Sequence, residues 1–257
     1  MSQASILARS AVQGGDIDPA SSSSTSLKLD ECGQEIRQTL NLSHLLTLTT
    51  LHVAFVITGA GFSGFWYHLG LFKSISTLDE YDYFCYSSGC LSIVLGFLNT
   101  DVEYAYDVCR DIQIAWSQGR MSSYEIIDEF LERLLPAEEK LFSSLFPRLN
   151  IISTSLDSGV EIRQAKNRTE LLSYLRRTTR IPLLTGRAWL KDAGQRYVDG
   201  GFSRMFHPPC RWTVEIPVTW STYIHSLNPG VSKERVFEFV ELGLSGPNPF
   251  LVGSSKC

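Results

Sequence analysis

A glycine-rich turn behind an apolar run constrains the fold of this chain most strongly. Residues 53–58 read Val-Ala-Phe-Val-Ile-Thr, a run typical of a buried strand, and residues 59–64 follow directly as Gly-Ala-Gly-Phe-Ser-Gly. Glycines at this spacing bring bare backbone N–H groups to the start of a helix, where negative charge is favoured. Such groups either hold a dinucleotide pyrophosphate or stabilise an oxyanion during acyl transfer. The turn therefore predicts a strand–turn–helix unit, and the residues downstream must decide which chemistry it serves.

Composition places the chain among globular α/β proteins. It has 257 residues, of which 44% are hydrophobic and 19% charged, enough for one domain with a sizeable core. The net charge of −4 argues against a nucleic-acid binder, which would show a basic patch. The six cysteines form no C-x-x-C pair, so we expect free thiols in a reducing compartment rather than disulfides or a metal site.

Strand-like and helix-like segments alternate along the chain. Residues 1–50 are expected to form a disordered leader, because they contain a serine-rich run and no compact apolar signal segment. Strands are predicted at 52–58, 81–86, 149–155, 159–162, 213–218 and 235–242, and helices at 64–78, from 90, from 100, from 122 and at 169–177. The apolar stretch 42–72 is broken by glycines and is not expected to span a membrane. This alternation predicts a mostly parallel α/β sheet.

A dinucleotide site needs an acidic residue at the far end of its second strand, where the residue binds a ribose hydroxyl. Asp79, Glu80 and Asp82 lie before that strand or at its start. The far end reads Tyr-Ser-Ser-Gly at 86–89, which offers no such acid. A dinucleotide-binding oxidoreductase is therefore a minor alternative.

The same far end resembles the G-x-S-x-G nucleophile elbow. Residues 85–89 read Cys-Tyr-Ser-Ser-Gly, with Cys85 in place of the first glycine. An elbow holds its serine on a tight strand-to-helix turn, and the residues two before and two after the serine must be small. Gly89 fits that requirement, and Cys85 is small enough. Ser87 is thus a candidate nucleophile, although Ser-Ser-Gly also occurs as an ordinary helix cap.

A serine nucleophile needs a base. The usual base is a histidine that follows an aspartate in the order Ser–Asp–His. Only His207 and His225 could fit that order. The chain's five histidines are His44, His52, His68, His207 and His225. The better candidate is Asp199, because Gly200 and Gly201 follow it in a tight turn that can aim its carboxylate.

Taken in order, these segments resemble the patatin-like phospholipase family over roughly 52–205. The turn at 59–64 with His-Leu-Gly-Leu at 68–71 is similar to its oxyanion block, 85–91 to its elbow, 180–184 to its Ile-Pro segment and 199–201 to its Asp-Gly-Gly motif. The sequence of 61–68, Gly-Phe-Ser-Gly-Phe-Trp-Tyr-His, looks closest to the triacylglycerol-lipase branch of that family.

The resemblance implies a three-layer α/β fold with a mostly parallel central sheet. The acyl hydrolase domain would cover 51–220, and an extension at 221–257 would pack on it. The resemblance also implies a Ser–Asp dyad that cleaves glycerolipid esters through an acyl-enzyme, without metal or cofactor, at a membrane or lipid-droplet surface. The chain would then be intracellular, either cytoplasmic or peripheral on such a surface, with a plastid as an alternative.

The resemblance assigns roles residue by residue. Ser87 would be the nucleophile and Asp199 its base. The backbone at Gly59, Ala60, Gly61 and Phe62 would form the oxyanion hole, and further glycines would support the motifs: Gly64, Gly89, Gly200 and Gly201. Cys85, Ser88 and Cys90 depart from the usual elbow residues, which keeps open a weakened or inactive lipid-binding protein.

Two other groups of residues have both a structural and a functional interpretation. Phe65, Trp66 and Tyr67 are expected in the core, with an acyl pocket as the alternative. The basic cluster of Arg176, Arg177 and Arg180 with Arg187 is expected to be a solvated helix end, with binding of anionic head groups as the alternative.

Overall fold

The computed structural model describes residues 54–202, 212–214 and 231–246. The chain divides into two units, Met1–Leu51 and His52–Cys257, and every described residue belongs to the second. The expected leader at 1–50 lies outside the described residues, as do His44, His52, His207 and His225.

A twisted sheet forms the centre of the second unit. Its described strands are β1 (Ala54–Ile57), β2 (Asp82–Cys85), β3 (Leu149–Ser155), β4 (Gly159–Arg163), β5 (Leu190–Asp192), β6 (Gln195–Val198) and β7 (Trp212–Val214). They follow the order β5-β6-β3-β2-β1-β7, with β4 paired to β3. The pairs β7–β1, β1–β2 and β2–β3 are parallel, while β4, β5 and β6 pair antiparallel. The carboxyl ends of β1 and β2 therefore lie side by side.

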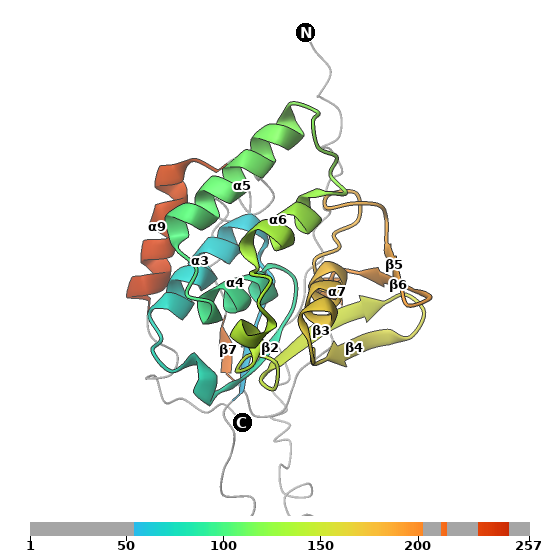
Figure 1. Ribbon diagram of the computed structural model, residues 1–257, viewed down its shortest axis with the longest axis horizontal. Helices are drawn as coiled ribbons and strands as arrows, with labels where there is room; N and C mark the ends of the chain where they lie inside the picture. Colours follow the sequence, from blue (N-terminus) through green and yellow to red (C-terminus); the bar gives the residue numbers. More distant parts are fainter. Residues whose placement is uncertain (1–53, 203–211, 215–230, 247–257) are drawn as a thin grey trace, which may run out of the picture. The chain divides into compact units, whose positions relative to one another are not determined.

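Helices flank this sheet (Figure 1). They are α3 (Gly61–Lys73), α4 (Ser88–Phe97), α5 (Val102–Ser117), α6 (Ile126–Leu134), α7 (Arg168–Thr178) and α9 (Lys233–Ser245), with 3-10 turns at Leu78–Glu80, Glu139–Phe142 and Gly200–Phe202. The prediction of an α/β protein with a mostly parallel open sheet is confirmed at this level. No helix among the described residues is long and apolar enough to cross a membrane.

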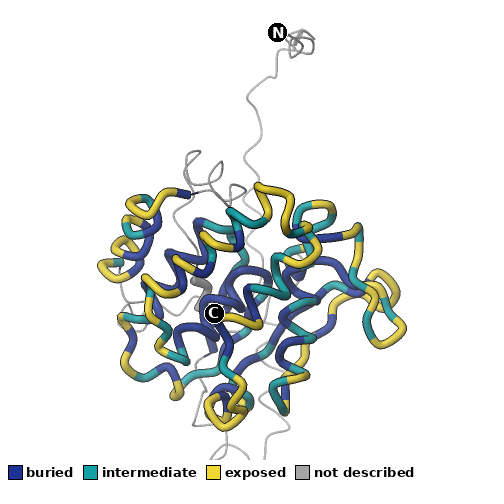
Figure 2. Tube along the Cα trace, turned by 45° about the horizontal axis from the view of Figure 1, so that its top comes forward, coloured by how far each residue is buried: buried dark blue, intermediate teal, exposed yellow. Residues whose placement is uncertain are grey.

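The core lies between the parallel strands and the helices packed on them. Phe55 of β1 stacks on Tyr83 of β2 at 6.0 Å, and Phe72 of α3 meets the same ring edge-on at 6.3 Å. β1, α3 and α4 are buried along most of their length, because these segments are apolar on every side (Figure 2). The site described below is attached to these rigid elements.

Among the described helices, α3 and α9 make the most extensive contact, and they lie side by side in Figure 1. A Cβ added to Gly70 would lie 2.1 Å from the carbonyl oxygen of Val240, and one added to Gly243 would lie 2.1 Å from that of Tyr67. Only glycine at these two positions lets the helix backbones approach so closely.

The prediction of a strand at 235–242 is wrong, because this segment lies within α9. Val236, Phe239, Val240 and Gly243 are its buried residues, and that spacing is helical. Ser232 caps the helix by accepting a hydrogen bond from the Arg235 N–H. The β-branched and aromatic residues suggested a strand, but burial against α3 outweighed that preference.

Helix starts also differ from the predicted ones. α3 begins three residues before the predicted start at 64, and α5 is capped by Asp101, whose side chain accepts from the Tyr104 N–H at 2.8 Å. The strand at 149–155 has the predicted bounds. Boundaries depend on single capping contacts, whereas a buried strand has a longer pattern.

Candidate active site

Ser87 lies between β2 and α4 on a strained turn. Its backbone has φ 52° and ψ −138°, a conformation that residues other than glycine rarely adopt. The side chain is 7% exposed and belongs to a pocket wall. A serine held this way at the end of a buried strand has the geometry of a nucleophile elbow.

Close backbone packing holds the elbow against β1. A Cβ at Gly89 would lie 2.6 Å from the Thr58 carbonyl oxygen and 2.8 Å from that of Ile57, so a side chain there would push α4 away. A Cβ at Gly59 would lie 2.5 Å from the Ser87 Cβ and 3.2 Å from its Oγ. The glycine turn after β1 therefore lies directly against the serine, as the sequence predicts for neighbouring parallel strands.

Thr178 joins the elbow to the neighbouring strand. The Ser87 N–H donates to the Thr178 Oγ1 at 2.9 Å, and the Thr178 hydroxyl donates to the Ile152 carbonyl at 2.6 Å. All three groups are buried. Thr178 could not be identified from the sequence, because a threonine at the end of a helix carries no motif of its own.

Asp199 lies in the same buried region, directly after β6. Its side chain Oδ1 accepts from the Gly201 N–H at 2.8 Å, its N–H donates to the Arg180 carbonyl at 2.7 Å, and its carbonyl accepts from the Thr154 hydroxyl at 3.1 Å. A Cβ at Gly200 would lie 2.8 Å from the Thr178 Oγ1. The Asp-Gly-Gly turn thus packs on the residue that holds the Ser87 N–H.

The Asp199 carboxyl group is more basic than that of a free aspartate. Burial raises its pKa from 3.8 to about 6, while hydrogen bonding by the Ser87 hydroxyl and the Gly201 N–H opposes that rise. Asp199 Oδ2 has no hydrogen-bond partner among the described residues. The Ser87 hydroxyl is therefore close to the carboxylate without a fully formed bond, which is common in enzymes before substrate binds.

The four expected oxyanion-hole residues surround the start of α3. The Ala60 N–H donates to the Ser88 Oγ at 3.0 Å, so it is already bonded. Gly61, at φ 61°, and Phe62 occupy the first turn of the helix, where N–H groups have no partner within the helix. Ala60 as cap offers no side chain to these groups. Gly61 and Phe62 are thus the better placed of the expected donors.

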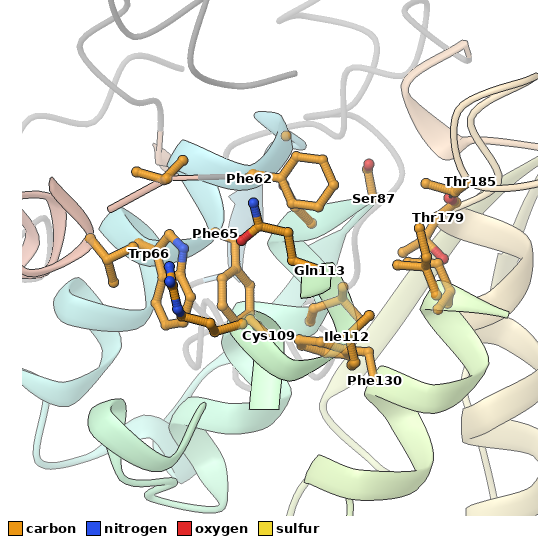
Figure 3. Close-up of a pocket in the computed structure, with 18 of the residues that line it drawn as sticks. Phe62, Phe65, Trp66, Ser87, Cys109, Ile112, Gln113, Phe130, Thr179 and Thr185 are labelled. Carbon is orange, nitrogen blue, oxygen red and sulfur yellow. The ribbon is translucent and has the colours of Figure 1, made fainter. Parts of the chain in front are cut away.

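An apolar pocket opens beside Ser87. Figure 3 shows Phe62, Phe65 and Trp66 on one side of it, Thr179 and Thr185 on the other, and Ser87 between them. α5 contributes Ile112 and Gln113 to the wall opposite. Further lining residues from α4, α5 and α6 are mostly apolar. Phe65 and Trp66 are therefore both core residues, as expected, and pocket residues.

A disulfide joins Cys85 to Cys90 with a Cα–Cα distance of 5.0 Å. Both side chains are fully buried. The expectation of free thiols is wrong for this pair, because the turn at Ser87 brings the end of β2 and the first turn of α4 together. Cys109, a pocket residue, is a free cysteine among those described. Sequence spacing alone gave no signal, since a separation of five residues matches no common disulfide or metal pattern.

His68 is the one histidine among the described residues, and it lies in the core away from the pocket wall. Neither ring nitrogen has a hydrogen-bond partner among the described residues, and burial lowers its pKa from 6.5 to about 4. The described pocket wall contains no histidine. Within the described residues, Asp199 is the base that lies near Ser87.

Comparison of the sequence with family models and with curated proteins gave no match.

Proposed function

We propose that the chain is a serine-dependent hydrolase of lipid carboxylic esters, related in design to the patatin-like enzymes and sharing their three-layer fold. The observation that supports this most is the buried Asp199 carboxylate, with a pKa raised to about 6, beside a serine on a strained turn. Perturbed acids next to a nucleophile in a pocket are typical of active sites. The apolar pocket wall favours a fatty acyl chain as the group that is bound.

In this proposal, Ser87 Oγ attacks the ester carbonyl carbon while Asp199 Oδ2 takes its proton. The tetrahedral oxyanion is stabilised by the N–H groups of Gly61 and Phe62 at the positive end of α3. The carbon–oxygen bond of the ester then breaks, and the leaving alcohol takes the proton from Asp199. Water attacks the acyl-enzyme in the same way, releasing the fatty acid and restoring Ser87.

The test measures Ser87→Ala in a hydrolysis panel of 4-nitrophenyl octanoate, a triacylglycerol and a phospholipid, together with labelling by a fluorophosphonate. Turnover and labelling should both be lost. Ser92→Ala is the matched control, since Ser92 is a buried serine of α4 that donates to the Phe65 carbonyl and does not line the pocket. Undiminished hydrolysis by Ser87→Ala would refute the proposal.

A lipid-binding protein with weak or no turnover is the second candidate. It is favoured by the Ala60 N–H, which the Ser88 hydroxyl already occupies, and by the incomplete hydrogen bond at Asp199 Oδ2. Binding of a fatty acid with no Ser87-dependent turnover of the three esters would support it. A dinucleotide role is not favoured, because the turn after β1 faces Ser87 and opens on an apolar pocket.

A further inference from the structure

The Cys85–Cys90 disulfide encloses the elbow. Cys85 is the last residue of β2 and Cys90 lies in the first turn of α4, so the bond connects the two elements between which Ser87 turns. Both sulfurs are fully buried, on the core side of the turn. No other described residue pair ties the strand to the helix covalently.

The small ring suggests that the bond acts locally. A disulfide stabilises a fold mainly by restricting the unfolded chain, and that effect grows with the length of the loop it closes. Here the two cysteines are separated by 5 positions, so the restriction of the unfolded chain is near its minimum. The larger consequence falls on the geometry of the few peptide groups inside the ring.

Those peptide groups include the strained one. A residue other than glycine at φ 52° persists only where its surroundings force the conformation. Gly89 packed on the carbonyls of β1 and Thr178 bonded to the Ser87 N–H are two such constraints. Neither fixes the distance between the strand end and the helix start, and the disulfide does.

We propose that the Cys85–Cys90 disulfide is a positioning element for the Ser87 nucleophile, so that full activity requires the oxidised pair. This inference rests on the proposed hydrolase function. Loss of the bond lets α4 move away from β2, and Ser87 Oγ leaves its place between Asp199 and the turn after β1. A displacement of about 1 Å at a reacting atom can lower a rate about 100-fold.

The redox step is a thiol–disulfide exchange. A thiolate of an added dithiol attacks one sulfur and breaks the Cys85–Cys90 bond; its second thiol then attacks the mixed disulfide. The products are two cysteine thiols and the cyclic disulfide of the reductant, so two electrons and two protons pass to the protein. Because both sulfurs are buried, this exchange requires local opening and should be slow.

The experiment compares the oxidised full-length chain, the same chain reduced with dithiothreitol, and the variant Cys85→Ala/Cys90→Ala. For each, kcat and KM are measured with 4-nitrophenyl octanoate, and Ser87 labelling is measured with a fluorophosphonate. We expect kcat and the labelling rate to fall roughly 10- to 100-fold with KM within about twofold. Cys32→Ala, outside the described residues, controls for the removal of a thiol.

The outcomes separate this inference from the proposed function. An unchanged kcat in the reduced chain, or free thiols at Cys85 and Cys90 in the fully active protein by non-reducing peptide mapping, would overturn the positioning role. Failure of the hydrolase proposal would appear instead as no Ser87-dependent labelling in the oxidised chain. Amide hydrogen exchange over 86–91 then decides: faster exchange after reduction supports the positioning role, and equal exchange refutes it.

Discussion

Two aspartates of the β5–β6 hairpin have opposite surroundings: Asp192 is the last residue of β5, and Asp199 directly follows β6. Asp192, just before the β5–β6 turn, accepts from the Arg177 Nε at 2.8 Å and the Ser173 hydroxyl at 2.5 Å. Burial raises the pKa of Asp192, but the hydrogen bonds from Ser173 and Arg177 together lower it by more, so its pKa lies below the usual value. Asp199, just after β6, has no cation beside it among the described residues, and burial raises its pKa to about 6. Asp192 is stabilised as an ion by its partners, whereas Asp199 is the proposed proton acceptor.

Arg177 contributes to the lowered pKa of Asp192 and is itself held by several partners. The guanidinium lies over the Tyr197 ring at 4.4 Å and donates to its hydroxyl at 3.3 Å, and it lies 4.0 Å from the Glu161 carboxylate. The expectation that this arginine is solvated is wrong, since it is buried. The buried charge of Arg177 has several partners and serves the structure, whereas the buried carboxyl group of Asp199, with its raised pKa, is a candidate functional group.

The largest expected effect is that of Asp199→Asn. It should lower kcat at least about a thousandfold, because an amide cannot take the Ser87 proton. It should also stabilise the fold by up to about 3 kcal/mol at pH 8, because the ionised carboxylate opposes burial. Chemical denaturation and ester turnover of the same preparation measure both. An Asp199→Asn variant that is active and less stable than the parent would contradict the contrast drawn between Asp192 and Asp199.

The same pKa predicts the pH profile. The base must be ionised, so kcat/KM should rise with pH with a midpoint near 6. A pH-independent rate between 5 and 8 would point to a different base.

Arg177→Met should have the next largest effect, on stability alone. It leaves Glu161 and Asp192 without their buried cation, which should cost about 3–5 kcal/mol in the free energy of unfolding. Ester hydrolysis by the remaining folded protein, measured well below its melting temperature, should stay within about tenfold of the parent. Arg196→Met is the control, since its partner Asp157 is at the surface and little stability should be lost.

The stability of the fold at low pH depends on His68 as well as on Asp199, because burial shifts their pKa values in opposite directions. Its folded pKa of about 4 lies below the 6.5 of the free side chain, so its contribution to stability is present above 6.5 and is lost as pH falls toward 4. Asp199 acts in the opposite sense: its raised pKa gives stability that is present below 3.8 and lost as pH rises through 6. Each contribution amounts to about 3 kcal/mol, so the two largely cancel in the parent.

Single variants should expose each contribution. In Asp199→Asn, acid should destabilise the fold between pH 6.5 and 4 more steeply than in the parent, and in His68→Phe less steeply. The measurement is urea denaturation at several pH values, taken as the difference from the parent. Parallel curves for both variants and the parent would show that neither group has a shifted pKa.

The smallest expected effect is that of Thr178→Val. It removes the acceptor of the Ser87 N–H while keeping the shape of the side chain, and kcat should fall about tenfold with KM unchanged. Thr178→Ser keeps the hydroxyl and should retain the parental kcat. Equal kcat for all three proteins would assign Thr178 to packing alone.

The placement of Ser87, Asp199 and the turn at 59–64 could be predicted because each follows a strand and carries a local spacing. Thr178 and the Cys85–Cys90 bond could not, since they depend on where a distant helix ends and on how sharply the chain turns at one serine. The helix at 233–245 was predictable from its buried spacing, but its strand-like residue types hid that signal. Local patterns thus located the proposed reacting groups, while the contacts that hold them arise from tertiary packing.

The crossing of α3 and α9 also determines when the unit can fold. α3 follows β1 early in the unit, yet its glycine-paired partner lies at Lys233–Ser245, and β1 itself pairs with Trp212–Val214. Contacts between such distant segments cannot form during synthesis until the late segments have left the ribosome. During translation, the apolar faces of β1 and α3 therefore remain without these partners until the segments at 212–214 and 233–245 have been released.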